Sequence, residues 1–113
     1  MPITNQQAAE HAFLRRMYED SYFPDHLVDK GRAILLWLCE QIEAEKPSDL
    51  DALHALTRAA TEEFNTLDRE FHTAGSGIET AAREWIGEEF GFVASVYGFT
   101  DADEGELIAA RDW

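Results

Sequence analysis

Apolar side chains recur at steps of three and four residues along three long stretches of the chain, which is the spacing of amphipathic α-helices. The stretches cover residues 25–46, 49–73 and 76–97. In the middle stretch the apolar arc consists of Leu50, Leu53, Leu56, Ala60, Phe64, Leu67 and Phe71. No segment alternates between apolar and polar residues for long enough to predict a β-strand. The pattern therefore predicts an all-α fold.

Proline, glycine and capping residues mark where these helices begin and end. Pro24 separates a weaker first helix, over residues 5–18, from the second, which stops before Pro47. Ser48 opens the third helix and Ser76 opens the fourth, because each has an acidic residue three positions later, as in a capping box. With short connections, these elements predict one domain over residues 1–113. We expect an antiparallel bundle of four main helices with a short C-terminal helical turn or tail.

Charge limits the class of partner. The 113 residues contain 23 acidic and 9 basic side chains, a net charge of −14. Residues 1–38 carry 5 acidic and 4 basic side chains, whereas residues 39–113 carry 18 and 5. A surface this acidic disfavours nucleic acid and anionic membranes as ligands and favours a basic protein or a metal cation.

The only cysteine, Cys39, lies in the longest apolar run, residues 33–39, which is about a third of a membrane span. A single cysteine cannot form an internal disulfide, and this suits a reducing compartment. The first ten residues have neither a basic start nor an apolar block, so we expect no secretory leader. These features predict a cytoplasmic protein.

Glu89 breaks the apolar pattern of the fourth helix. Its neighbours three and four residues away are Trp85, Ile86, Phe92 and Val93. A carboxylate at such a position must be paired, hydrogen-bonded or protonated, because an unpaired buried charge costs several kcal/mol. We expect a partner from another helix: the arginines to consider are Arg15, Arg32 and Arg58, and a tyrosine or histidine would also serve. The pair is either structural or a tuned acid or base, and the structural interpretation is favoured.

Polar and aromatic side chains crowd the junction between the first and second helices. They include Tyr18, Asp20, Tyr22, His26 and Asp29. His26 and Asp29 are three residues apart and share a helix face, as a metal pair or as a base with its orienting carboxylate would. The simpler interpretation is a turn whose aromatic residues close the end of the core.

Small residues on the fourth helix point to a close neighbour. Gly87 and Gly91 lie opposite its apolar arc, and each interior glycine costs about 0.8–1 kcal/mol relative to alanine. We expect the C-terminal tail, with Leu107, Ile108 and Trp113, to fold back onto this strip.

Catalytic and metal-binding motifs give no further support. The Glu-x-x-His pair of di-iron bundles is absent, and so are zinc-protease, P-loop and dinucleotide-binding motifs. The sequence predicts no metal and no cofactor.

Four blocks of sequence carry a resemblance that spans nearly the whole chain: MYEDSYFPDHLVDK, LCEQIE, EEFGFVASVYGF and ARDW. With these blocks the chain resembles an uncharacterised bacterial family, the domain of unknown function number five-seven-one-three. The resemblance implies a small stand-alone bacterial protein and supplies no catalytic residue.

Two hypotheses for function remain. The first is an acidic protein-interaction module, such as an immunity or inhibitor protein, that steers a basic partner and holds it through Trp37, which lies outside its helix's apolar arc. The second is a small enzyme or ligand-binding bundle that uses Glu89 and the Tyr18–Asp29 junction. No spacing matches a known catalytic template, so the sequence favours the first. It predicts a basic protein partner, no nucleic acid, no membrane, and a monomer or homodimer.

Overall fold

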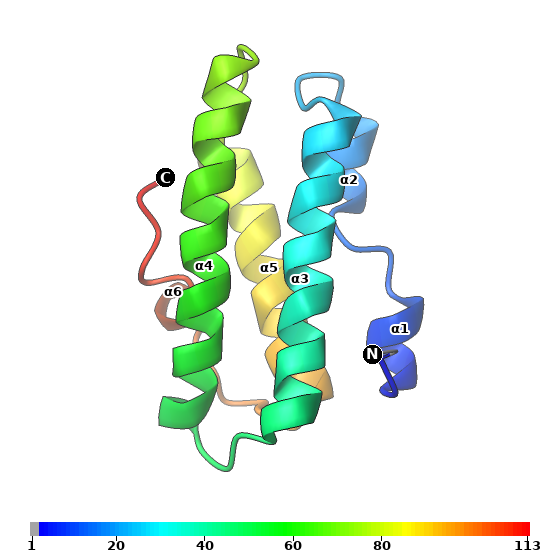
Figure 1. Cartoon of the computed structure of the whole chain (residues 1–113), viewed down its shortest axis with the longest axis vertical. Coiled ribbons are helices and arrows are strands. Elements are labelled where there is room, and N and C mark those ends of the chain that lie inside the picture. Colours follow the sequence, from blue (N-terminus) through cyan, green and yellow to red (C-terminus); the bar gives the residue numbers. More distant parts are fainter. Residues whose placement is uncertain (1–2) are drawn as a thin grey trace.

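The computed structural model describes residues 3–113 and contains three long antiparallel helices: α3 (Asp25–Glu45), α4 (Leu50–Thr73) and α5 (Thr80–Val96). Figure 1 shows α3 and α4 side by side with α5 behind them. The short helices α1 (Gln6–Glu10) and α2 (Arg15–Glu19) lie on the α3 side, and α6 (Glu104–Leu107) lies on the α4 side. The predicted all-α bundle with a short C-terminal helical turn is confirmed.

Caps and glycines end the long helices close to the predicted positions, with two differences. The side chain that caps α4 is Asp49, whose carboxylate accepts the Ala52 N–H at 2.8 Å, and not Ser48. Ser76 does not cap α5, which begins four residues later, and its buried hydroxyl has no hydrogen-bond partner within residues 3–113. Gly75 takes a φ of 83° directly after α4, a conformation that favours glycine.

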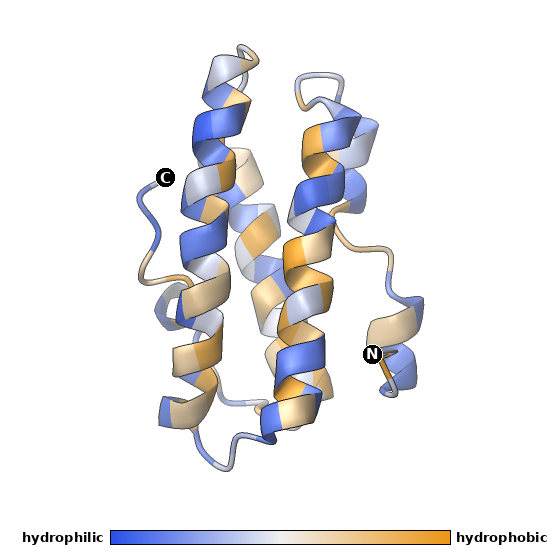
Figure 2. Ribbon diagram, viewed as in Figure 1, coloured by the Kyte–Doolittle hydropathy of each residue, from blue (hydrophilic) through white to orange (hydrophobic). Residues whose placement is uncertain are grey.

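The core lies where the three long helices meet. Figure 2 shows apolar segments concentrated in the lower halves of α3 and α4 and along α5, with polar residues on the upper part of α4. The largest fully buried side chains are Phe13, Phe64, Phe71, Phe90, Met17, Leu35, Leu38, Leu53, Ile86, Leu107, Val28 and Val93. Burial of such side chains stabilises the fold by about 1.5–3 kcal/mol each. Two of them, Phe13 and Met17, come from the segment before α3, so the N-terminal elements belong to the same core.

The weak first helix predicted over residues 5–18 is broken in the structure. After α1 the backbone of His11 is extended (φ −70°, ψ 135°), and Leu14 adopts a left-handed conformation (φ 60°, ψ 30°) before α2 begins. In a continuous helix the Leu14 N–H would bond to the carbonyl of Glu10. Here it points instead to a side chain of α5, and this break creates the candidate site described below.

Glu43 of α3 anchors the start of the chain. Its carboxylate accepts the backbone N–H groups of Thr4 and Asn5 at 2.9 and 3.0 Å, and the hydroxyl of Tyr97 at 2.5 Å. Burial opposes ionisation of Glu43, but these donors outweigh it and lower its pKa to about 2. Asn5 also donates to the carbonyl of Val96 at 2.8 Å. The N-terminal segment is thus held against α3 and the end of α5.

The C-terminal tail folds back over α4 and α5, as the glycine strip predicts. A Cβ on Gly91 would lie 2.8 Å from the Glu104 carboxylate, and one on Gly87 would lie 3.5 Å from Ile108. Asn65 of α4 holds the tail from both sides, donating to the carbonyl of Ala110 at 3.1 Å and accepting the N–H of Asp112 at 3.0 Å.

Candidate functional site

Glu89 of α5 is paired, and its partners come from the break between α1 and α2. Its side chain is 13% exposed. One carboxylate oxygen lies 2.9 Å from Nε2 of His11, and the other accepts the Leu14 N–H at 2.6 Å. With the carboxylate as acceptor, Nε2 is the donor in this contact, which corresponds to the tautomer with its proton on Nε2. The left-handed turn at Leu14 directs its N–H to Glu89.

Of the partners expected for Glu89, a histidine is found, and the three arginine candidates are wrong. Neither Arg15, Arg32 nor Arg58 bonds to it; a histidine does, together with a backbone amide. The general requirement that this carboxylate be paired holds, because its neighbours on α5 are apolar. Its partner could not be read from spacing, since His11 lies 78 residues away along the chain.

Aromatic side chains fix the ring of His11. It stacks on Phe92 with centroids 3.9 Å apart and planes at 21°, and Phe13 meets it edge-on at 4.6 Å. The side chain remains 28% exposed. No hydrogen bond to its second ring nitrogen, Nδ1, is found within residues 3–113, and Nδ1 is not among the buried unsatisfied atoms. The imidazole thus has one nitrogen bonded to Glu89, and its other nitrogen has no hydrogen bond within these residues.

The His11 ring forms part of the wall of two neighbouring clefts, of about 340 and 510 Å³. His11, Ala12 and Arg15 line both. The smaller cleft is completed by Leu14, Arg16, Trp85, Glu88 and Glu89, and the larger by Phe13, Tyr18, Glu19 and Arg32. We call these two spaces together the His11 cleft.

Arginines gather around the His11 cleft. Arg15, Arg16 and Arg32 are three of only nine lysines and arginines in the chain. Arg15 pairs with Glu19 at 3.3 Å and Arg16 with Glu88 at 3.8 Å, and all four side chains are more than half exposed, so these pairs are weak. Arg32 has no hydrogen bond or ion pair within the described residues 3–113. Its guanidinium is therefore available to a ligand.

The structure brings part of the predicted Tyr18–Asp29 junction to this cleft. Tyr18 lines it, and the Tyr18 hydroxyl donates to Asp29 at 2.6 Å. Burial, followed by this bond to a carboxylate, raises the pKa of Tyr18 to about 12. Asp29 therefore binds a tyrosine rather than His26, and His26 is exposed and forms no hydrogen bond or ion pair within residues 3–113. Glu89 lines the smaller half of the His11 cleft and Tyr18 the larger half.

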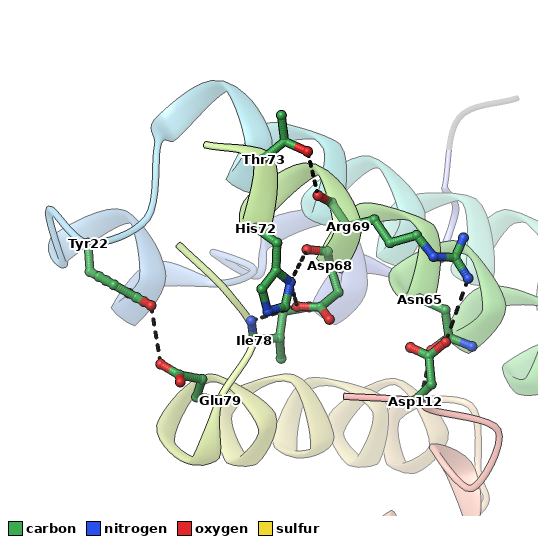
Figure 3. Close-up of polar contacts among 9 residues, drawn as sticks. All are labelled: Tyr22, Asn65, Asp68, Arg69, His72, Thr73, Ile78, Glu79 and Asp112. Atoms are coloured by element: carbon green, nitrogen blue, oxygen red, sulfur yellow. Dashed lines mark hydrogen bonds and ion pairs between the residues drawn. The ribbon is translucent and has the colours of Figure 1, made fainter. Parts of the chain in front are cut away.

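The other predicted site residues lie outside the His11 cleft. Asp20 accepts the N–H of Tyr22 at 2.9 Å in a local turn. Tyr22 is 46% exposed and donates to Glu79 at 3.2 Å, a contact that ties the α2–α3 turn to the start of α5 (Figure 3). Trp37 of α3 is 37% exposed and lines a separate cleft of about 340 Å³ with Ala33, Ile34 and Glu63. The site residues predicted from the sequence therefore lie in three separate places: the His11 cleft, the α2–α3 turn and the cleft beside Trp37.

A second carboxylate–histidine pair shows what a structural pair looks like. Asp68 of α4 accepts the Ile78 N–H at 2.8 Å, and its carboxylate lies 3.4 Å from Nδ1 of His72 (Figure 3). That nitrogen is already within 2.8 Å of the backbone carbonyl of Asp68, and the His72 side chain is 63% exposed. The pair closes the α4–α5 connection. It has neither the aromatic packing nor the arginine-lined clefts of His11.

One further cleft, of about 510 Å³, lies between α4 and the C-terminal tail. Its charged walls are Asp51, His54, Arg58 and Glu106. Nε2 of His54 is buried without a hydrogen-bond partner in the described part of the chain. Two carboxylates and one arginine line it, so this cleft favours an anion less than the His11 cleft does.

Metal binding finds no support in residues 3–113, where no group of three or more histidine, cysteine or acidic side chains is placed to hold an ion. Over the same residues no helix has both the length and the apolar character needed to cross a membrane. Burial raises the pKa of the Cys39 thiol to about 12, which leaves it an unreactive core residue.

Comparison with known proteins places the chain in a family without a described activity. Neither a curated protein nor a solved structure matches it. A family model described as "Family of unknown function (DUF5713)" matches residues 7–113, which include every residue of the His11 cleft. The chain therefore belongs to this family of unknown function, DUF5713.

Proposed function

We propose that this protein binds a small organic anion in the His11 cleft. The observation that carries the proposal is the gathering of Arg15, Arg16 and Arg32 around one imidazole in a chain of net charge −14. Guanidinium groups bind carboxylates through two parallel hydrogen bonds, and the apolar walls formed by Phe13 and Trp85 suit a hydrocarbon body.

The acidic remainder of the chain does not prevent such binding. Residues 39–113 carry nearly all of the net charge, and the molecule is 40 Å along its longest axis. At physiological ionic strength charges are screened over about 8 Å, so carboxylates farther than this from the cleft have little effect on a ligand bound there. Three carboxylates also line the cleft: Glu19, Glu88 and Glu89. Glu19 and Glu88 form weak exposed pairs that a tighter-binding ligand can replace, and Glu89 is already bonded to His11 and to the Leu14 N–H.

Calorimetric titration with benzoate tests the proposal, because benzoate combines a carboxylate with a flat apolar body. Arg32→Gln should weaken binding by about tenfold or more, since it removes a charged hydrogen-bonding group. Arg58→Gln is the matched control: it removes the same charge from the cleft between α4 and the tail, and it should leave the affinity unchanged. Equal affinity in Arg32→Gln and the unmodified protein, or loss in Arg58→Gln, would refute the site.

A second candidate function has its own observation. Trp37 is 37% exposed and lines a cleft with Glu63, so an exposed aromatic side chain lies next to an acidic one. This combination suits an interaction module for a basic protein, with the charge speeding encounter and the tryptophan slowing dissociation. The proposed setting for either function is the cytoplasm, for which the single unpaired Cys39 is suited.

The interaction module is tested by recovering basic proteins from a cell extract and measuring association at two salt concentrations. The association rate should fall steeply as salt rises, and Trp37→Ala should mainly speed dissociation. An association rate that is indifferent to salt would remove this candidate.

A further inference from the structure

We propose that His11 is a general base, held in one tautomer by Glu89, that activates water against an ester carried by the bound anion. The inference rests on the proposed function, because the cleft must first hold the ester. His11 would be the catalytic residue and Glu89 a positioning residue. The argument comes from three features of the His11 ring.

The first feature is the tautomer. The ionised carboxylate of Glu89 accepts a hydrogen bond from Nε2 at 2.9 Å, so the proton of the neutral ring sits on Nε2. Nδ1 then carries a lone pair and is free to accept a proton. A base oriented through its other nitrogen by a carboxylate is the arrangement that general-base sites use.

The second feature is the rigidity of the pair. The remaining oxygen of Glu89 is held by the Leu14 N–H at 2.6 Å, and Phe92 and Phe13 pack on the face and edge of the His11 ring. The left-handed backbone of Leu14 (φ 60°) is uncommon for a leucine, and such conformations gather at functional sites. The ring and its carboxylate are therefore fixed before any ligand binds.

The third feature is the position of Nδ1 and its surroundings. The ring borders both halves of the His11 cleft, and Nδ1 has no bonded partner within residues 3–113. No serine hydroxyl or cysteine thiol is bonded to His11 in that part of the chain. The nucleophile must therefore come from solvent, so water is the group that His11 would activate.

The chemical step balances without another reagent. As a bound water attacks the ester carbonyl, a new C–O bond forms and the proton of the water passes to Nδ1. Glu89 stabilises the resulting imidazolium. When the bond to the alcohol breaks, its oxygen keeps the bonding pair and takes the proton from Nδ1, which restores the neutral histidine.

Hydrolysis of mono-4-nitrophenyl succinate, an anionic ester with a coloured leaving group, provides the activity test. His11→Gln should lower the rate by about 100-fold, within the range that positioned general bases contribute. Glu84→Gln is the matched control, because it removes an exposed carboxylate of the same helix, α5, that lines neither half of the His11 cleft. Equal hydrolysis by the unmodified protein and His11→Gln would overturn the proposal.

The role of Glu89 is tested by measuring which ring nitrogen of His11 carries the proton. In Glu89→Gln the amide oxygen should accept from Leu14 and the amide N–H should face Nε2, so the ring proton should move to Nδ1. Nitrogen-15 shifts of the neutral His11 ring should therefore exchange between the two nitrogens in Glu89→Gln and stay unchanged in Glu84→Gln. Hydrolysis should fall with kcat while KM changes little. A ring with its proton on Nδ1 in the unmodified protein would contradict the assignment.

Competition by benzoate separates this inference from the binding proposal. Inhibition of hydrolysis by benzoate that is lost in Arg32→Gln supports both. Hydrolysis that needs His11 but ignores benzoate refutes the anion site and leaves the base in place. Benzoate binding without hydrolysis that depends on His11 refutes the base alone.

Discussion

Two short segments flank the three long helices, and they are fastened by different chemistry. The C-terminal tail is held mainly by side-chain amide, hydroxyl and guanidinium groups that bond to its backbone, as Asn65 does to Ala110 and Asp112. The N-terminal segment is held by two carboxylates, Glu43 and Glu89, that accept bonds from it. The C-terminal tail is thus attached mostly through uncharged groups. The N-terminal segment is attached through carboxylates and lies beside the His11 cleft.

The difference indicates which segment is built for function. Backbone carbonyls bonded by amide groups stabilise a tail without reserving any group for chemistry. The N-terminal attachment has a leucine in the left-handed conformation. Within residues 3–113 it also has an imidazole nitrogen and an arginine that form no hydrogen bond or ion pair. A purely structural attachment needs none of these features, because Asp68 fixes the α4–α5 connection without them.

Glu89→Ala should have the largest effect on stability. It leaves the buried Leu14 N–H and the His11 ring without their acceptor, so the free energy of unfolding should fall by about 3 kcal/mol. Chemical denaturation measures the change, and Glu88→Ala, an exposed neighbour, should change it by less than about 0.5 kcal/mol. Similar losses in both variants would mean that Glu89 contributes only charge.

Gly31→Ala should have the second-largest effect on stability, because the added methyl group would be too close to Leu14 of the N-terminal segment. A Cβ there would lie 2.9 Å from Leu14, 3.2 Å from Phe64 and 3.4 Å from Leu67, all buried. Overpacking of this kind costs about 1–3 kcal/mol. The matched variant on the tail side is Gly91→Ala in α5, where the added Cβ would meet the side chain of exposed Glu104, which can move away. Thermal melting should show a clear loss for Gly31→Ala and little or none for Gly91→Ala.

Asn65→Ala tests the tail attachment itself. It removes two hydrogen bonds at a partly exposed position, so stability should fall by about 1 kcal/mol. The loss should be the same at pH 4 and pH 7, because no ionisable group takes part in these bonds. A loss that depends on pH would show that the neighbouring Arg69–Asp112 pair, at 3.7 Å, carries the attachment.

The smallest effect, local fraying, should appear at the N-terminus in acid. The pKa of Glu43 falls from 4.5 to about 2 on folding, so its stabilising contribution is present above about pH 4.5 and is lost as the pH falls towards 2. Amide hydrogen exchange at Thr4 and Asn5 should speed up across this range before exchange in α4 does. Glu43→Gln should remove this pH dependence, and unchanged dependence would assign it to another carboxylate.

The long helices could be predicted from the sequence because their signals are local. Apolar periodicity, Pro47 and Gly75 sufficed, and Gly87 and Gly91 correctly indicated a close neighbour. The break over residues 11–14 could not be predicted, because alanines and arginines on either side favour helix. It exists because Glu89, distant in sequence, takes the Leu14 N–H. His11 was therefore missed, although Glu89 itself was identified as a charge that needs a partner.

A crystal structure with 4-bromobenzoate would test the account most directly, because anomalous scattering locates the bromine without prior assumptions. We expect the ligand in the His11 cleft, its carboxylate on Arg32 or Arg15 and its ring beside His11. A bromine only in the cleft lined by Asp51, His54 and Arg58, or only beside Trp37, would contradict the assignment of the ligand site to His11.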